Sequence, residues 1–193
     1  MTMTLAAVIL AAGQGTRLKS ALPKVLHPLA GRPLVAYAVG TAEAATGRPP
    51  VLVVGHGGEA VRAALGDRAV YVTQAEQLGT GHAVQQAAAV LKGQSTAVLV
   101  TYGDMPLLRE ETLRALADVQ AHHTGPLTLL TVISPHLRDF GRVVRDADGR
   151  VRAVVEVAQA TPEQRRITEL NAGAYCFQAN WLWEALPRLP LSP

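Results

Sequence analysis

Two glycines and two basic residues near the N-terminus form the first group whose types and spacing suggest a role in binding or catalysis. Gly13 and Gly15 follow an apolar run at 5–12, and Arg17 and Lys24 come soon after them. A strand that leads into a glycine loop can direct backbone N–H groups at a phosphate, which glycine lets the chain approach closely. The two cations could neutralise charge on a leaving pyrophosphate. The alternative is an ordinary turn with solvated bases, because neither a Rossmann fingerprint nor a P-loop sequence is present.

A second group lies at 74–83, where the chain reads Gln-Ala-Glu-Gln-Leu-Gly-Thr-Gly-His-Ala. The side-chain amide of Gln74 offers both a donor and an acceptor, which the imide edge of uracil requires. Gly79 and Gly81 would let backbone groups approach that edge. On chemistry alone, the segment also fits a polar loop that opens a helix.

Asp104 follows another apolar run, in the segment Tyr102-Gly103-Asp104-Met105-Pro106-Leu107. Open α/β sheets bind ligands at the carboxyl ends of their strands. A carboxylate there could hold Mg²⁺, which favours a few carboxylates together with phosphate oxygens. A lone aspartate at a strand end can equally cap a helix or a turn.

Three residues in the last third of the chain have the chemistry that a sugar needs. Gly141, Glu156 and Asn171 would supply a backbone N–H, a carboxylate and an amide to sugar hydroxyl or N-acetyl groups. Taken singly, each also fits a turn or a strand end.

The elements that would position these residues alternate along the chain. Short continuous apolar runs are typical of strands buried on both faces, and helical patterns separate them. The strands are expected at 5–12, 51–54, 70–73, 97–101 and 127–133, and the helices at 34–45, 59–65, 82–91 and 110–122. This order predicts βαβ units and an α/β fold with a mostly parallel sheet covered by helices on both faces.

The pattern changes after Ser134. Asp148-Gly149 lies between β-rich segments at 142–145 and 151–157, which predicts a hairpin. Thr161 to Gln164 has the sequence of a capping box at the start of a short helix. A strand is expected at 171–178, followed by a helix at 181–186 with Asn180 as its cap. A small β-rich excursion is therefore expected after the α/β core.

Composition excludes several classes of protein. With 49% apolar and 17% charged residues in 193, the chain is not mainly disordered. A net charge of +3 and 4% aromatic residues give little support for nucleic-acid binding. The single cysteine excludes an internal disulfide. The apolar run at 5–12 has no basic residues before it and is too short to span a bilayer, so we expect a cytoplasmic protein that does not bind membranes.

The motifs together resemble the sugar-nucleotide pyrophosphorylases. Leu10-Ala11-Ala12-Gly13-x-Gly15-Thr16-Arg17, then Pro23-Lys24-Val25-Leu26-His27, is similar to the uridyltransferase domain of the bacterial bifunctional N-acetylglucosamine-1-phosphate uridyltransferase / glucosamine-1-phosphate N-acetyltransferase. The segment 74–83 is nearly identical to that family's motif, and Gly-Asp-x-Pro-Leu matches its metal aspartate. The resemblance covers essentially the whole chain. It implies a Rossmann-like nucleotidyltransferase fold in which N-acetylglucosamine 1-phosphate attacks UTP, yielding UDP-N-acetylglucosamine, a cell-wall precursor, and pyrophosphate.

The resemblance also implies the role of each site residue. Arg17 and Lys24 would contact phosphates, and Asp104 would bind Mg²⁺. Tyr102, Gly141, Glu156 and Asn171 would bind the sugar. The nucleotide would lie against Leu10, Ala11, Ala12, Gly13, Gln74, Gly79 and Thr80.

The chain departs from the family pattern in two ways. It reads Val157-Ala158-Gln159 where the family usually carries a lysine and an aspartate after the glutamate. We also expect a single nucleotidyltransferase domain over 1–193 that lacks its last elements and the acetyltransferase β-helix, and hence a monomer or weak dimer. Two alternatives stay open: another sugar-1-phosphate nucleotidyltransferase, or a non-catalytic module that binds UDP-sugars.

Overall fold

The computed structural model describes residues 3–13, 15, 18–20, 22–136 and 139–190. The chain folds into two compact units. The first contains Met1–Thr128 and Tyr175–Pro193, and the second contains Leu129–Ala174. Two strands, β7 (Leu127–Ile133) and β10 (Glu169–Gln178), run from one unit into the other.

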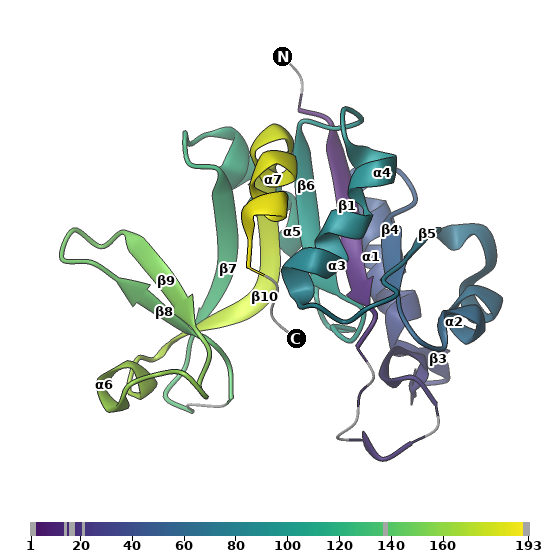
Figure 1. Ribbon diagram of the computed structural model, residues 1–193, viewed down its shortest axis with the longest axis horizontal. Helices are drawn as coiled ribbons and strands as arrows, with labels where there is room; N and C mark the ends of the chain where they lie inside the picture. The colour runs from purple at the N-terminus through teal and green to yellow at the C-terminus, as the bar shows by residue number, and fades with distance from the viewer. Residues whose placement is uncertain (1–2, 14, 16–17, 21, 137–138, 191–193) are drawn as a thin grey trace. The chain divides into compact units, whose positions relative to one another are not determined.

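The sheet of the first unit is mostly parallel, which confirms the expected fold class (Figure 1). Its strands lie in the order β5-β4-β1-β6-β10, and only β10 runs antiparallel to its neighbour β6. The four parallel strands are β1 (Leu5–Ala11), β4 (Val51–Val54), β5 (Val70–Thr73) and β6 (Ala97–Tyr102).

Helices cover both faces of this sheet, which explains the apolar strands. Every residue of β4 is buried, as is all of β1 after Leu5. A strand covered on both faces has no solvent side, so its sequence is an unbroken apolar run. In Figure 1, α3 and α4 lie in front of the sheet, and α1 and α5 lie behind it. The helices of the first unit up to this point in the chain are α1 (Leu34–Thr46), α2 (Gly58–Leu65), α3 (Thr80–Gln86), α4 (Ala88–Leu91) and α5 (Glu110–Ala121).

The strand order reverses at β1. From β1 the chain passes through α1 to β4 on one side, and through α2 to β5. It then returns through α3 and α4 to β6 on the other side of β1. Such a reversal opens a crevice at the carboxyl ends of the strands, where α/β proteins bind ligands.

The second unit contains the predicted hairpin. β8 (Arg142–Arg145) and β9 (Val151–Val155) pair antiparallel, and β8 also pairs with β10. The turn between them is closed by Asp146, whose Oδ1 accepts hydrogen bonds from the amides of Asp148 and Arg150 at 3.0 and 2.9 Å. The predicted capping box is also present, with Thr161 before α6 (Pro162–Arg165).

Several local expectations were wrong. The strand at 127–133 pairs with β10 and not with the parallel strands. The helix expected at 82–91 is divided at Ala87, whose amide bonds to the Val84 carbonyl three residues back, which tightens the turn. The last helix, α7 (Ala179–Ala185), begins one residue before Asn180, and its N-cap is Gln178. A hairpin of β2 (Pro28–Leu29) and β3 (Arg32–Pro33) was not expected.

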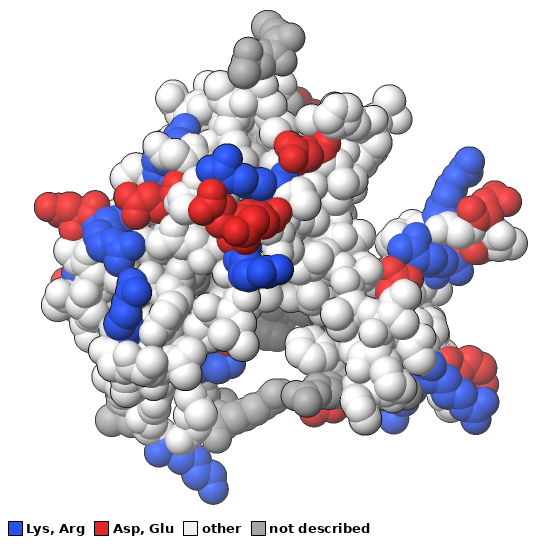
Figure 2. Space-filling view, turned by 180° about the vertical axis from the view of Figure 1, so that it is seen from behind, with Lys and Arg blue, Asp and Glu red and all other residues white. Residues whose placement is uncertain are grey.

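Charges of both signs are interspersed on the face shown in Figure 2. Ion pairs among the described residues include Glu110 with Arg114 on α5, at 2.7 Å, and Glu43 with Arg68, at 3.6 Å. Within the described ranges, no helix is both long enough and apolar enough to cross a membrane.

Candidate active site

A cavity of about 630 Å³ lies in the first unit, where β1 and β6 reach their carboxyl ends. Of the fourteen residues that the sequence proposed for the site, ten line this cavity and three lie in the second unit. The remaining one, Arg17, lies outside the described residues, as do Gln14 and Thr16 of the same loop. The cavity is lined by Leu10, Ala11, Ala12, Gly13, Gly15, Leu18, Lys24, Val25, Gln74, Gln77, Gly79, Thr80, Ala83, Tyr102 and Asp104.

Gly15 lies directly against Lys24. Its backbone is left-handed, with φ of +60°, and a Cβ added there would lie only 2.6 Å from the Cβ of Lys24. Lys24 begins a short 3₁₀ turn whose next residues, Val25 and Leu26, are buried and fix its backbone. Glycine is therefore required at 15, because any side chain would displace either the loop or the lysine.

Lys24 and Asp104 form an ion pair at the cavity. Their side chains are 45% and 28% exposed, so both remain within reach of a ligand. Asp104 lies just beyond β6, and the preceding Gly103 donates its amide to the carbonyl of Leu10 at 2.9 Å. The pair thus places one cation and one anion beside the ends of β1 and β6.

The segment after β5 forms another wall of the cavity. Gln74 is only 4% exposed, its backbone amide bonds to the Val54 carbonyl at 2.8 Å, and its Nε2 donates to the Gly79 carbonyl at 3.1 Å. Gln77, to which the sequence assigned no role, donates its Nε2 to the Ala12 carbonyl at 2.8 Å. That bond ties the wall to the loop after β1.

Tyr102 is the last residue of β6 and also lines the cavity. The sequence grouped it with the sugar residues, whereas in the fold it lies among the residues proposed for the nucleotide. Leu18, Val25 and Ala83 add apolar surface that sequence reasoning did not assign to the site. In the sequence, the one feature that could have pointed to these three residues is that they lie within or beside the same motifs.

The other three predicted sugar residues lie together within the second unit. The backbone N–H of Asn171 donates a hydrogen bond to the carbonyl of Gly141 at 2.8 Å. A Cβ on Gly141 would lie 3.2 Å from Oε1 of Glu156, so the three residues are neighbours. The divergent segment Val157-Ala158-Gln159 forms a turn directly after Glu156, closed by the Gln159 amide on the Glu156 carbonyl at 2.9 Å.

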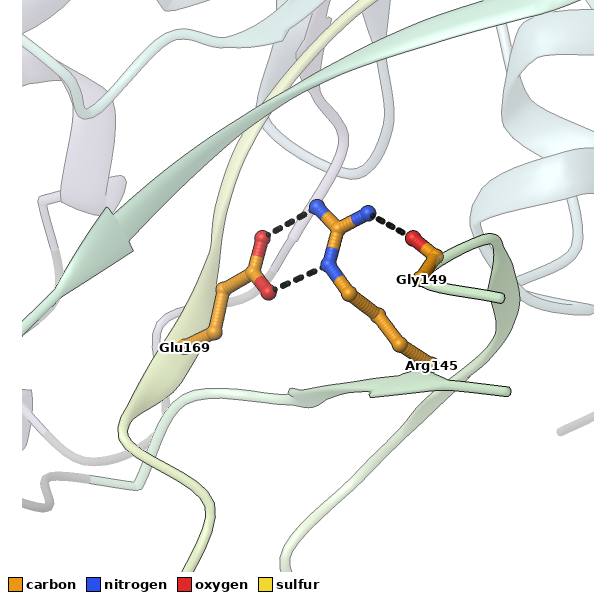
Figure 3. A network of polar contacts seen from close by, with 3 residues as sticks. All are labelled: Arg145, Gly149 and Glu169. Atoms are coloured by element: carbon orange, nitrogen blue, oxygen red, sulfur yellow. Dashed lines mark hydrogen bonds and ion pairs between the residues drawn. The ribbon is translucent and has the colours of Figure 1, made fainter. Parts of the chain in front are cut away.

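An ion pair fixes the strand that carries Asn171 (Figure 3). Arg145 on β8 donates two hydrogen bonds of 2.7 Å to the carboxylate of Glu169 on β10, and a third to the Gly149 carbonyl. The hydrogen bonds from Arg145 hold the pKa of Glu169 below its ordinary value of 4.5. Because Asn171 lies two residues along β10, this network helps to hold it in register with β8.

A metal at the first unit's cavity would have one protein carboxylate, Asp104. Among the residues that the structure describes, no group of three or more histidine, cysteine or acidic side chains could hold a metal by itself. Asp104 fits an ion such as Mg²⁺, which is bound by one or two carboxylates together with substrate phosphates.

Comparison with known proteins decides the family. Residues 7–170 match the MobA-like NTP transferase domain. The chain belongs to this family. It is accordingly a nucleotidyltransferase enzyme, as the sequence motifs predicted, and membership in the NTP transferase family suggests a divalent metal.

Similar proteins include several bacterial relatives named "Bifunctional protein GlmU". Over 187 residues the chain is 48% identical to that of Geobacter metallireducens, covering 96% of this chain and 39% of the relative. The protein of Brevibacillus brevis is 46% identical over 180 residues (93% and 39%), and that of Enterococcus faecalis 45% over 185 (94% and 40%). The chain thus spans about two fifths of the length of these relatives.

Proposed function

We propose that this nucleotidyltransferase transfers a uridylyl group from UTP to N-acetylglucosamine 1-phosphate. The products would be UDP-N-acetylglucosamine and pyrophosphate. One observation carries the proposal: ten residues from separate motifs, which the sequence assigns to phosphate, nucleotide, sugar and metal, line a single cavity at the strand reversal. The 45–48% identity to the bifunctional relatives supports the same substrates.

In this proposal the loop after β1 and Lys24 bind the phosphates of UTP. The amides near Gly13 and Gly15 would face the anion, while the ammonium group of Lys24 neutralises charge on the departing pyrophosphate. Arg17, which follows in the same loop, is assigned a second phosphate contact. Asp104 would hold Mg²⁺, which when bound neutralises phosphate oxygens and orients them.

The chemical step needs no covalent enzyme intermediate. An oxygen of the sugar phosphate attacks the α-phosphorus of UTP in line, and the bond from that phosphorus to the bridging oxygen breaks. Pyrophosphate leaves with the bonding electron pair. The nucleophile is already anionic, so positioning and charge neutralisation provide the catalysis.

Recognition of the two organic groups is divided between two sets of residues. Gln74, Gly79 and Thr80, with the backbone of Ala11, Ala12 and Gly13, would read the uracil ring. Gly141, Glu156 and Asn171 in the second unit would bind N-acetylglucosamine. The mixture of carboxylate, amide and backbone groups suits hydroxyl and acetamido partners.

We further propose that the protein acts in the cytoplasm, where it supplies a cell-wall precursor, and that this chain is a monomer or weak dimer. The resemblance to the bifunctional relatives supports the pathway. Light scattering on the purified chain tests the oligomeric state, since a stable trimer would contradict it.

Pyrophosphate release from UTP, N-acetylglucosamine 1-phosphate and Mg²⁺ tests the reaction. We expect release to need both substrates and to fall at least about 100-fold in Asp104→Ala, because such electrostatic groups contribute that much to catalysis. Asp118→Ala is the matched control. Asp118 lines a separate cavity of about 500 Å³ beside Thr4 and Gln94, at the amino end of β1. Loss of release in both variants, or in neither, would contradict the assignment.

A non-catalytic module that binds UDP-sugars is the second candidate. The turn at Val157-Ala158-Gln159 favours it, because that turn lacks the lysine and aspartate usual in the family. Calorimetry separates the two functions. Tight binding of UDP-N-acetylglucosamine without any pyrophosphate release would support the binding module and overturn the enzymatic proposal. Release with another nucleotide or another sugar phosphate would instead identify a different transferase of the family.

A further inference from the structure

His82 lies against the buried amide of Gln74. The Nε2 atom of Gln74 is 3.1 Å from the Gly79 carbonyl oxygen and 3.1 Å from Nδ1 of His82. An amide nitrogen carries two hydrogens, so these two contacts use both. The Gly79 oxygen can only accept, and it therefore requires the NH₂ end of the amide.

The imidazole of His82 also contacts a second glutamine. Nε2 of Gln86 lies 3.1 Å from Nε2 of His82 and 3.0 Å from the His82 carbonyl oxygen. A neutral imidazole has one acceptor nitrogen, so it cannot accept from both amides. Gln74 is buried, whereas Gln86 is partly exposed and keeps its bond to the carbonyl. Leaving a buried N–H without a partner costs more, which assigns the acceptor nitrogen Nδ1 to Gln74.

This arrangement leaves Oε1 as the free end of the Gln74 amide. Among the residues that the structure describes, none is hydrogen-bonded to that oxygen, and Gln74 lines the cavity. The site thus offers an acceptor. Uracil carries a hydrogen on N3 and can donate it there. Cytosine carries a lone pair on N3, and two acceptors would face each other.

We propose that His82 is a positioning residue that holds the Gln74 amide with its oxygen toward the ligand, and so sets a preference for uridine over cytidine nucleotides. The inference rests on the proposed binding of a uridine nucleotide in this cavity. His82 carries its proton on Nε2 and does not itself touch the base.

Binding of UTP and CTP to three variants tests the proposal. Cytosine could be bound only if the Gln74 amide turned its NH₂ group toward the ligand, which in the wild type breaks its hydrogen bond to His82. His82→Leu removes that acceptor, so turning the amide costs one hydrogen bond less in this variant. The ratio of UTP to CTP affinity should fall roughly fivefold, which corresponds to about 1 kcal/mol for one net hydrogen bond. His82→Asn keeps an acceptor near the position of Nδ1 and should keep most of the ratio. Gln86→Leu removes only the competing amide and should leave the ratio unchanged.

A merely structural role for His82 would weaken both nucleotides equally, and an unchanged ratio in His82→Leu overturns the proposal. Nitrogen-15 NMR of the histidine rings gives a second readout that does not need turnover. We expect the Nε2–H tautomer in the wild type, and an Nδ1–H tautomer would also overturn the proposal. If the wild-type chain binds neither UTP nor UDP-N-acetylglucosamine, the proposed function fails instead, which is a separate outcome.

Discussion

Replacing Gly15 with alanine should disable the cavity more than it destabilises the fold. A Cβ at this position would lie 2.6 Å from the Cβ of Lys24 and 3.5 Å from its Cα. Two Cβ atoms cannot approach one another as closely as 2.6 Å. The left-handed backbone, with φ of +60°, adds about 1 kcal/mol for alanine. The loop or Lys24 must therefore move. Because a misplacement of about 1 Å can cost about 100-fold in rate, we expect kcat/KM for pyrophosphate release to fall roughly 10- to 100-fold.

Gly47→Ala is the matched control. Gly47 is also left-handed, with φ of +70°, but a Cβ there has nothing within 4 Å, and it ends α1 away from the cavity. Urea unfolding should show a loss of about 1 kcal/mol for this variant, with unchanged kcat/KM. The difference between the two variants isolates the contact with Lys24. Wild-type kcat/KM in Gly15→Ala would refute the reasoning.

Two further predictions concern titratable groups. Arg145→Met should destabilise the second unit by about 1 kcal/mol at pH 7, measured by amide hydrogen exchange in β8 and β9. The pKa of Glu169 is lowered below 4.5, so the difference in stability between the wild type and Arg145→Met should shrink as the pH falls through that lowered pKa. A difference in stability that stays constant with pH would contradict the role of the ion pair. Burial raises the pKa of Cys176 to about 12, so iodoacetamide at pH 8 should label it only after unfolding. Rapid labelling of the folded chain would show that the thiol is not buried.

The central strands of the first unit could be predicted from sequence because burial on both faces leaves an unbroken apolar pattern, and the run at 51–54 coincides with the fully buried β4. The run at 70–73 coincides with β5, although this edge strand is partly exposed. The hairpin of β2 and β3 was missed since each strand has two residues, too few for any periodicity, and each contains a proline. The break at Ala87 has no glycine or proline to signal it.

The candidate site could be predicted only within its motifs. Residues close in sequence, such as those at 74–83, were assigned together because their types and spacing are distinctive. The ion pair of Lys24 with Asp104 and the bond from Gln77 to Ala12 join different motifs. Such contacts depend on the crossover that returns β6 to the side of β1, which no local pattern specifies.

His82 illustrates the same limit. In the sequence it has no acidic partner and no metal-ligand spacing, so nothing distinguished it from a structural histidine. Its contact with Gln74 arises because the loop between them turns back at Gly79, which has φ of +96°. Sequence therefore predicts the glutamine that is proposed to read a base, but not the histidine that is proposed to orient it.

The location of the nucleotide is the central claim, and an NMR titration with UTP tests it most directly. In nitrogen-15 spectra we expect the largest amide shifts at Ala12, Gly13, Gly79 and Thr80, which line the cavity at the carboxyl ends of the strands. The separate cavity at the amino end of β1, represented by Gln94, should stay unchanged. Shifts concentrated around that second cavity, or no shifts at saturating UTP, would contradict the account.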